Sequence, residues 1–290
     1  MKLNYVSARG DKLPLFGNPL FHIINVDGMT KATSNLSSVV IGGLDGDEVN
    51  NVQVQPRPII IDIQIRDGVN VEDAKRAILQ VIKLKQRGSL IWEQNNKTLT
   101  ITGIVEYVDM PRFAKGVVMQ IALHCEQPFW EDIAEAIQEI SATINMHYFT
   151  SYPYEMLYFP ENGIAFGRYD TSKAKSFTND GDVAVGMEII ITAIGIVTNP
   201  IIYDTDGKFF GVGYGNGDKR VVMGSGDRIV ISTHKGNKTV KLNGVSMYDK
   251  IKPQSTWLQL QAGENQFRVD SDESELDNMT FQLEYKQRYI

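Results

Sequence analysis

Six glycines between Gly211 and Gly226 are the residues of this chain whose type and spacing most invite a chemical interpretation. They lie in the stretch FFGVGYGNGDKRVVMGSGDRIVIS. A dinucleotide site needs GxGxxG before a helix, because the N–H groups at the helix N-terminus hold the pyrophosphate. Here Asn216 or Asp218 takes the place of the third glycine, and strand-like sequence follows. The glycines therefore favour hairpin turns over a phosphate site.

The four histidines, His22, His124, His147 and His234, are far apart in the sequence and show no zinc-binding spacing. The fragment HCE at 124–126 resembles half of a deaminase motif, but the required downstream CxxC is absent. As the only cysteine, Cys125 cannot form an intramolecular disulfide. Strand or core positions are the favoured interpretation, although a Cys–His pair remains open on sequence alone.

Acidic and serine motifs point to turns and loops. The sequence from Asp45 departs from a calcium-binding loop at Val49, and Asp204–Gly207 has the composition of a β-turn. The acidic run 270–277 lies between two expected strands, and GSG at 224–226 lacks the strand-to-helix context of a serine hydrolase. We therefore expect no enzyme, no catalytic residue, no cofactor and no metal site.

Aromatic residues between 148 and 159, among them Tyr152 and Tyr154, are the remaining candidates for a binding site. Aromatic rings offer flat faces on which a sugar can stack, although an inter-domain packing cluster is the favoured interpretation. A carbohydrate-binding β-sandwich that helps adsorption to the host cell wall is therefore the alternative function. An enzyme acting on cell-wall polymer is the weaker rival, since no carboxylate pair is evident.

Charge and hydropathy exclude two classes of partner. The net charge is −6, and no cluster of Lys and Arg suits the phosphates of nucleic acid. Asp11, Pro14 and Pro19 interrupt the N-terminal apolar runs, so neither a signal peptide nor a membrane span is expected. We expect synthesis and assembly in a cytoplasm.

The first half of the sequence predicts an α+β domain at residues 1–145. Residues 57–66 alternate like a half-buried strand, and residues 71–86 have the period of an amphipathic helix that Gly88 would stop. A second helix is expected at 130–142, where isoleucines fall on one helical face. Strand-like runs separate the two.

The second half, residues 146–290, predicts a β-sandwich or jelly roll, because short β-rich runs alternate with turn residues. Residues 25–54 are polar and dotted with glycine between strand signals. A segment of this length is unusual in a compact monomer. It suggests a β-hairpin arm that pairs with another subunit, or else a disordered loop.

The order of these segments resembles one known family, the distal tail proteins (Dit) or siphovirus tail component proteins of long-tailed phages and prophages. The resemblance covers essentially the whole chain. It is carried by fold signatures in sequence, which are LDGDEVNN, RPIIIDIQIR, VEDAKRAILQVIKL, LTITGIVEYVDM, VVMQIALHCEQPFW, NDGDVAVGMEIIITAIGIVTNPIIYD, GDRIVISTHKGNKTVKLNGVS and WLQLQAGENQFRV. None of these motifs is catalytic.

The resemblance implies a mainly β protein of two domains. Residues 1–145 would be a tail-tube-like β-sandwich with a helix and an arm, closing six copies into a ring, and residues 146–290 a galectin-like β-sandwich outside it. The ring would be the structural hub of a virion tail. It would join the distal end of the tail tube to the baseplate or tip, with the tail tube protein, the tail-associated tip protein and in some relatives receptor-binding proteins as partners.

Overall fold

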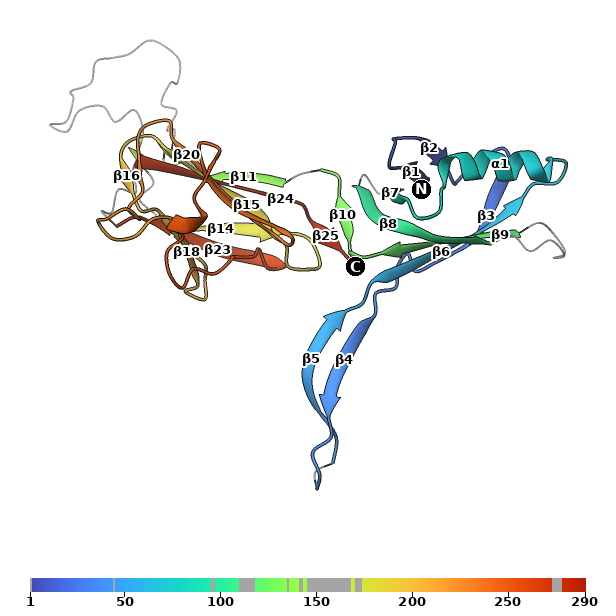
Figure 1. Cartoon of the computed structure of the whole chain (residues 1–290), viewed down its shortest axis with the longest axis horizontal. Coiled ribbons are helices and arrows are strands. Elements are labelled where there is room, and N and C mark those ends of the chain that lie inside the picture. Colours follow the sequence, from blue (N-terminus) through green and yellow to red (C-terminus); the bar gives the residue numbers. More distant parts are fainter. Residues whose placement is uncertain are drawn as a thin grey trace, which may run out of the picture. The chain divides into compact units, whose positions relative to one another are not determined.

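The structure is a computed structural model. It describes residues 2–43, 45–94, 97–109, 118–134, 136–140, 143–144, 168–169, 174–272 and 278–290. The chain is mainly β, as expected, and divides into two compact units (Figure 1). Unit 1 is Met1–Ala134 with Arg288–Ile290, and unit 2 is Glu135–Gln287. The division of function between residues 1–145 and 146–290 stays a prediction.

Unit 1 is built on one antiparallel sheet in the order β2-β1-β7-β8-β9-β6-β3. Its strands are β1 (Lys2–Ser7), β2 (Lys12–Pro14), β3 (Phe21–Asp27), β6 (Arg57–Ile65), β7 (Arg87–Gln94), β8 (Lys97–Asp109) and β9 (Val118–Cys125). The short strand β10 (Trp130–Asp132) pairs with β8 and with β25 (Arg288–Tyr289). The last residues of the chain thus return to the sheet of the N-terminal unit.

The strand predicted at 57–66 is confirmed as β6. Its alternation has a direct structural counterpart, because Ile59, Ile61, Ile63 and Ile65 are buried while the residues between them are less so. Ile59, Ile61 and Ile63 belong to the same core cluster as Ile78 of helix α1 (Val71–Val81). Figure 1 shows the helix lying along one face of the sheet.

Helix α1 begins as the sequence predicts, with the Asn70 side chain accepting a hydrogen bond from the N–H of Glu72 at 2.9 Å. It ends at Val81, earlier than the expected residue 86. The assignment of Gly88 as the helix stop was wrong, since Gly88 lies inside β7. An added Cβ there would lie 2.1 Å from the Tyr5 hydroxyl oxygen, so cross-strand packing is what requires this glycine.

The helix predicted at 130–142 was also wrong. That segment contains β10 and β11 (Ala136–Ile140), and β11 pairs with β24 (Met279–Tyr285) along its full length. Ile133, expected on a buried helical face, is 48% exposed. Strand β24 offers a free sheet edge, and pairing with it satisfies the backbone N–H and C=O groups of residues 136–140. This tertiary pairing overrides the local helical period.

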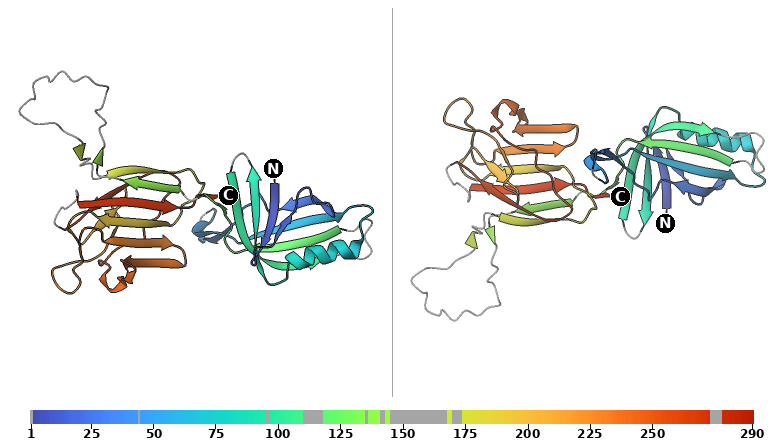
Figure 2. Two further views of the ribbon diagram at one scale, coloured as in Figure 1. Left: turned by 90° about the horizontal axis from the view of Figure 1, so that it is seen from above. Right: turned by 90° about the horizontal axis from the view of Figure 1, so that it is seen from below.

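Unit 2 is a sandwich of two antiparallel sheets, drawn as two layers in Figure 1 and from above and below in Figure 2. The first sheet contains β11, β24, β15 (Met187–Ala193), β20 (Arg228–His234), β21 (Asn237–Leu242) and β22 (Val245–Ser246). The second contains β14 (Ala174–Asn179), β23 (Gly263–Asp270), β17 (Ile201–Tyr203) and β18 (Phe209–Gly211). The core draws on both, with Ile189 and Leu283 from the first and Phe210 and Phe267 from the second.

Shorter elements complete the described chain. They are β12 (Thr143–Ile144), β13 (Arg168–Tyr169), β16 (Val197–Thr198), β19 (Val222–Met223) and the 3-10 turn η1 (Tyr248–Lys250). No helix in the described ranges has the length and hydrophobicity that crossing a membrane would need.

Candidate assembly interface

A two-stranded hairpin is the most exposed part of unit 1. It consists of β4 (Ser34–Val39) and β5 (Glu48–Val54), within the segment 25–54 that the sequence singled out. The two strands pair with each other in a sheet of their own, and every residue of both is exposed. Figure 1 shows them projecting from the body of unit 1. Of the two sequence-based alternatives, the structure has the hairpin; we call β4 and β5 together the arm.

One face of the arm is aliphatic. Residues opposite one another in an antiparallel pair share a face, so Leu36 lies beside Val52, and Val54 lies two residues further along the same face. A bulge between Ser37 and Ser38 shifts the register by one residue, which brings Val49 onto this face too. Without that shift, Val49 would alternate to the other side. The bulge therefore gathers the four aliphatic side chains.

These four side chains have no cover within the described chain. Leu36, Val49, Val52 and Val54 are exposed by 59, 48, 57 and 45%. The opposite face carries mainly polar residues, namely Asn35, Ser37, Asn51 and Gln53 with Val39 and Glu48. Such a clustered apolar surface with a polar reverse is typical of a segment that binds another protein surface.

The arm joins the body of unit 1 at a tightly packed point. Gly28 has φ +84°, and a Cβ placed on it would lie 2.1 Å from the backbone oxygen of Pro58. Arg57, which precedes Pro58 in β6, is buried and lies opposite Cys125 of β9 in the strand register. Only glycine permits both the left-handed backbone and this approach.

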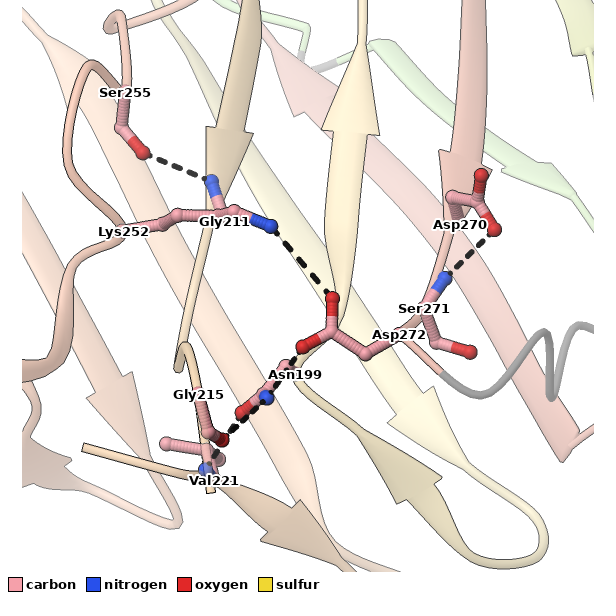
Figure 3. A network of polar contacts seen from close by, with 9 residues as sticks. All are labelled: Asn199, Gly211, Gly215, Val221, Lys252, Ser255, Asp270, Ser271 and Asp272. Carbon is pink, nitrogen blue, oxygen red and sulfur yellow. Dashed lines mark hydrogen bonds and ion pairs between the residues drawn. The ribbon is translucent and has the colours of Figure 1, made fainter. Parts of the chain in front are cut away.

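The glycine-rich stretch of unit 2 forms turns, and side chains of the same unit make hydrogen bonds to the backbone there. Asn199, buried and at φ +50°, donates from Nδ2 to Asp272 Oδ2 at 2.6 Å and accepts from the Val221 N–H at 2.8 Å. Lys252 lies 3.6 Å from the other oxygen of Asp272 (Figure 3). The strand β20 follows, as the sequence-based preference for turns anticipated.

The three histidines that the structure describes lie in three different strands. His22 lies in β3, where its Nε2 is 3.1 Å from Gln64 Oε1, while His124 is in β9 and His234 in β20. Cys125 is a buried free thiol. Among the described residues, no group of three or more His, Cys, Asp or Glu side chains could hold a metal ion. His147 falls outside the described residues.

The other sequence candidates are placed in part. Asp204–Gly207 is a turn, in which Asp204 Oδ1 accepts from the Lys208 N–H at 2.8 Å. The aromatic segment 148–159, with Tyr152 and Tyr154, and most of the acidic run 270–277 lie outside the described residues. The two features that sequence reasoning missed are the one-sided aliphatic face of the arm and the packed glycine at its base. A bulge and a close backbone approach leave no readable local pattern.

These features define a class: a mainly β protein of two units, the first of which carries an exposed arm with an aliphatic and a polar face. Residues 180–289 match the family model of the siphovirus-type tail component, C-terminal domain. This match confirms the resemblance to the siphovirus tail component family for residues 180–289.

The fold of the whole chain is that of a Dit protein. The crystal structure of SPP1 Dit (gp 19.1), described as a paradigm of the hub adsorption apparatus in phages infecting Gram-positive bacteria, matches with a TM-score of 0.67 and 12% identity over 99% of each chain. The baseplate of phage P2 in its activated conformation with Ca contains a chain that matches at a TM-score of 0.47 and 8% identity, over 99% of this chain and 97% of that one. No curated protein sequence matches significantly.

Proposed function

We propose that this phage tail component is the hub between tail tube and baseplate or tip, and that six copies close into a ring with an open axial channel. The observation that carries the proposal is the uncovered aliphatic face of the arm. Burying a side chain such as leucine or valine contributes about 1.5–3 kcal/mol, so four of them on each of six arms would be a substantial source of assembly energy.

A ring requires a heterologous contact, in which one surface of a subunit meets a different surface of its neighbour. A projecting arm suits such a contact because it reaches beyond its own core. In this proposal unit 1 forms the ring and unit 2, the sandwich, stands outside it. The partners would be the tail tube protein, the tail-associated tip protein and receptor-binding proteins.

The proposed role is structural and involves no catalysis. The family of residues 180–289 supports this, since it is a family of tail components. The turns of the glycine-rich stretch support it as well, because the Val221 N–H already donates to Asn199 Oδ1, whereas a phosphate-binding loop leaves such N–H groups for its ligand. In this proposal the protein acts only through the surfaces that bind its partners.

The oligomeric state tests the proposal. Light scattering and native mass spectrometry should give a mass six times that of the 32.5 kDa chain, and electron microscopy should show a six-fold ring with a central opening. A purified monomer would weaken the proposal for the isolated chain. Single copies in an intact tail, or a ring of another order there, would overturn it.

A further inference from the structure

A polar groove of about 450 Å³ opens on unit 2. It lies between the turn that follows β17, the extended segment 256–261, and β23. Six of its lining side chains could bind a ligand, namely Asp206, Trp257, Gln259, Gln261, Glu264 and Gln266. The groove is separate from the arm, which belongs to unit 1.

Two extended segments present these side chains by simple alternation. In 256–261, Leu258 and Leu260 point into the sandwich core with 2 and 0% exposure, so Gln259 between them and Gln261 after them face the groove. In β23, Asn265 and Phe267 are buried in the same manner, which turns Glu264 and Gln266 outward. The core packing thus fixes which polar side chains reach the groove.

The lining amides are free to bind a ligand, because the side chains of Gln259, Gln261 and Gln266 make no hydrogen bond to another described residue. The carboxylate of Glu264 is in the same situation. By contrast, the buried Asn265 is fully engaged with the turn around it, accepting from the Gln261 N–H at 2.8 Å and donating to the Gln261 oxygen at 2.7 Å. The groove therefore combines a rigid base with unused donors and acceptors.

Trp257 also lines the groove, although its half-buried ring packs against the core and lies 6.1 Å from the Tyr248 ring. Its ring is held against Phe210 with the centroids 4.7 Å apart, and the Lys238 ammonium lies 5.5 Å from the ring centroid. Because Phe210 belongs to the core, the indole is positioned before any ligand arrives. A pre-positioned aromatic surface beside amides is suited to a ligand with both apolar and hydroxyl-bearing faces.

The charges around the groove select among polar ligands. Among the lining residues there are three carboxylates, Asp204, Asp206 and Glu264, and one cation, Lys208, which is already paired with Asp206 at 3.0 Å. An anionic ligand would therefore meet net negative charge. Neutral hydroxyl groups can instead donate to the carboxylates and both donate to and accept from the amides.

We propose that this groove binds a neutral saccharide. The site differs from the aromatic segment 148–159 that the sequence suggested, and it does not depend on ring formation. Amides and a carboxylate would bind sugar hydroxyls, and the indole of Trp257 would contact the apolar face of a sugar ring. The groove would give the tail component a second, direct contact with the host surface.

Calorimetric titration of the full chain with neutral cello-, galacto- and N-acetylchito-oligosaccharides tests this. We expect one class to bind, and Gln259→Ala and Glu264→Ala each to weaken it about tenfold, the loss typical of a hydrogen bond. The matched control Gln53→Ala, on the polar face of the arm, should leave the affinity unchanged. Thermal melts of each variant identify any that fails to fold.

Three results would overturn the proposal. They are the absence of binding to every oligosaccharide, binding that Gln259→Ala and Glu264→Ala leave unchanged, and preferential binding of an anionic glycan such as a polyuronate. The mass of each variant, measured in parallel, reports separately on the proposed ring. If the chain forms a hexamer but binds no saccharide, only the groove proposal fails. If it binds saccharide but forms no hexamer, only the ring proposal fails.

Discussion

Arg57 and Trp130 donate hydrogen bonds to the same backbone oxygen, that of Met29. The distances are 3.0 Å from Arg57 Nη1 and 2.9 Å from Trp130 Nε1. Met29 lies at the base of the arm, whereas the two donors come from β6 and β10. The two hydrogen bonds hold the backbone of Met29 at the base of the arm. They fix the direction in which the chain leaves the sheet, although the two donors come from strands far apart in sequence.

The first prediction concerns this shared acceptor. Trp130→Phe should lower the free energy of unfolding of unit 1 by about 1 kcal/mol, because Arg57 still satisfies the carbonyl. Arg57→Met should cost little, since Arg57 Nε and Nη2 are buried without a partner among the described residues. In the double variant the oxygen loses both donors, and the loss should exceed the sum of the single losses. Urea unfolding measures all three, and simple additivity would contradict the prediction.

Gly28 should tolerate no side chain. Gly28→Ala combines a strained backbone with a clash against Pro58 O, so we expect a loss of several kcal/mol in the stability of unit 1, on the order of 3 or more. Gly10 has a similar φ of +91° but open space around its Cβ position, and Gly10→Ala should cost only about 1 kcal/mol. Equal losses in thermal melts would show that the close approach is unimportant.

The third prediction is that the arm is required for assembly and dispensable for folding. Replacing residues 34–54 by a short Gly-Ser link should abolish the ring and leave both units folded, because neither core contains a residue from that range. A longer deletion, of 28–52, would also remove Gly28 and Met29 and would damage the base of the arm. Rings that persist without 34–54 would exclude the arm as the assembly contact.

Paired substitutions on each face of the arm test which face makes the assembly contact. Leu36→Asn with Val52→Asn makes the aliphatic face polar and should prevent the ring from forming, as seen by light scattering. The matched control, Asn35→Ser with Gln53→Ser, changes an opposed pair on the polar face and should assemble normally. Identical behaviour of the two variants would contradict the assignment of the binding face.

Cys125 should be unreactive in the native protein. Burial raises the pKa of its thiol to about 11, against a smaller opposing effect of the Arg57 guanidinium. The native state therefore holds the thiol proton at pH values where the unfolded state has lost it, and this contribution to stability declines from pH 9.0 to about 11. Cys125→Ala should remove that part of the alkaline decline. Labelling by a thiol reagent at neutral pH without unfolding would contradict the prediction.

The last prediction concerns the pair Asn199 and Asp272. Asn199→Asp replaces the donor that lies 2.6 Å from Asp272 Oδ2 by a second carboxylate, so unit 2 should lose about 3 kcal/mol at neutral pH. Asp272→Asn in the same chain restores a donor and should recover much of the loss. If the double variant is no more stable than Asn199→Asp, the hydrogen bond between residues 199 and 272 is not the cause of the lost stability.

Local patterns in the sequence were sufficient for several elements. The alternation at 57–66 predicted β6, the helical period from residue 71 predicted the start of α1, and the failed GxGxxG spacing predicted turns. Each of these signals lies within a few consecutive residues, where side-chain period and backbone preference act directly. The segment 25–54 was recognisable as unusual by its polarity, but its form remained open between arm and loop.

Features that join distant residues could not be predicted in this way. Residues 136–140 have a helical period and are nevertheless a strand, because β24, far along the chain, offers them a sheet edge. Gly88 was expected to end a helix, although its actual requirement comes from Tyr5 on a neighbouring strand. Burial and pairing of this kind depend on the three-dimensional neighbour, which no local window contains.

The sequence by itself therefore determined the class of the protein, a mainly β chain, together with the amphipathic helix that follows Asn70 and the unusual polarity of segment 25–54. Only the tertiary structure decided that a bulge gathers Leu36, Val49, Val52 and Val54 on one face, and that Gln259 and Glu264 line a common groove. The physical reason is that alternation within a strand is a local property of the chain. Which face a strand exposes, and beside which other strand, is set by register and by the core that the distant segments build together.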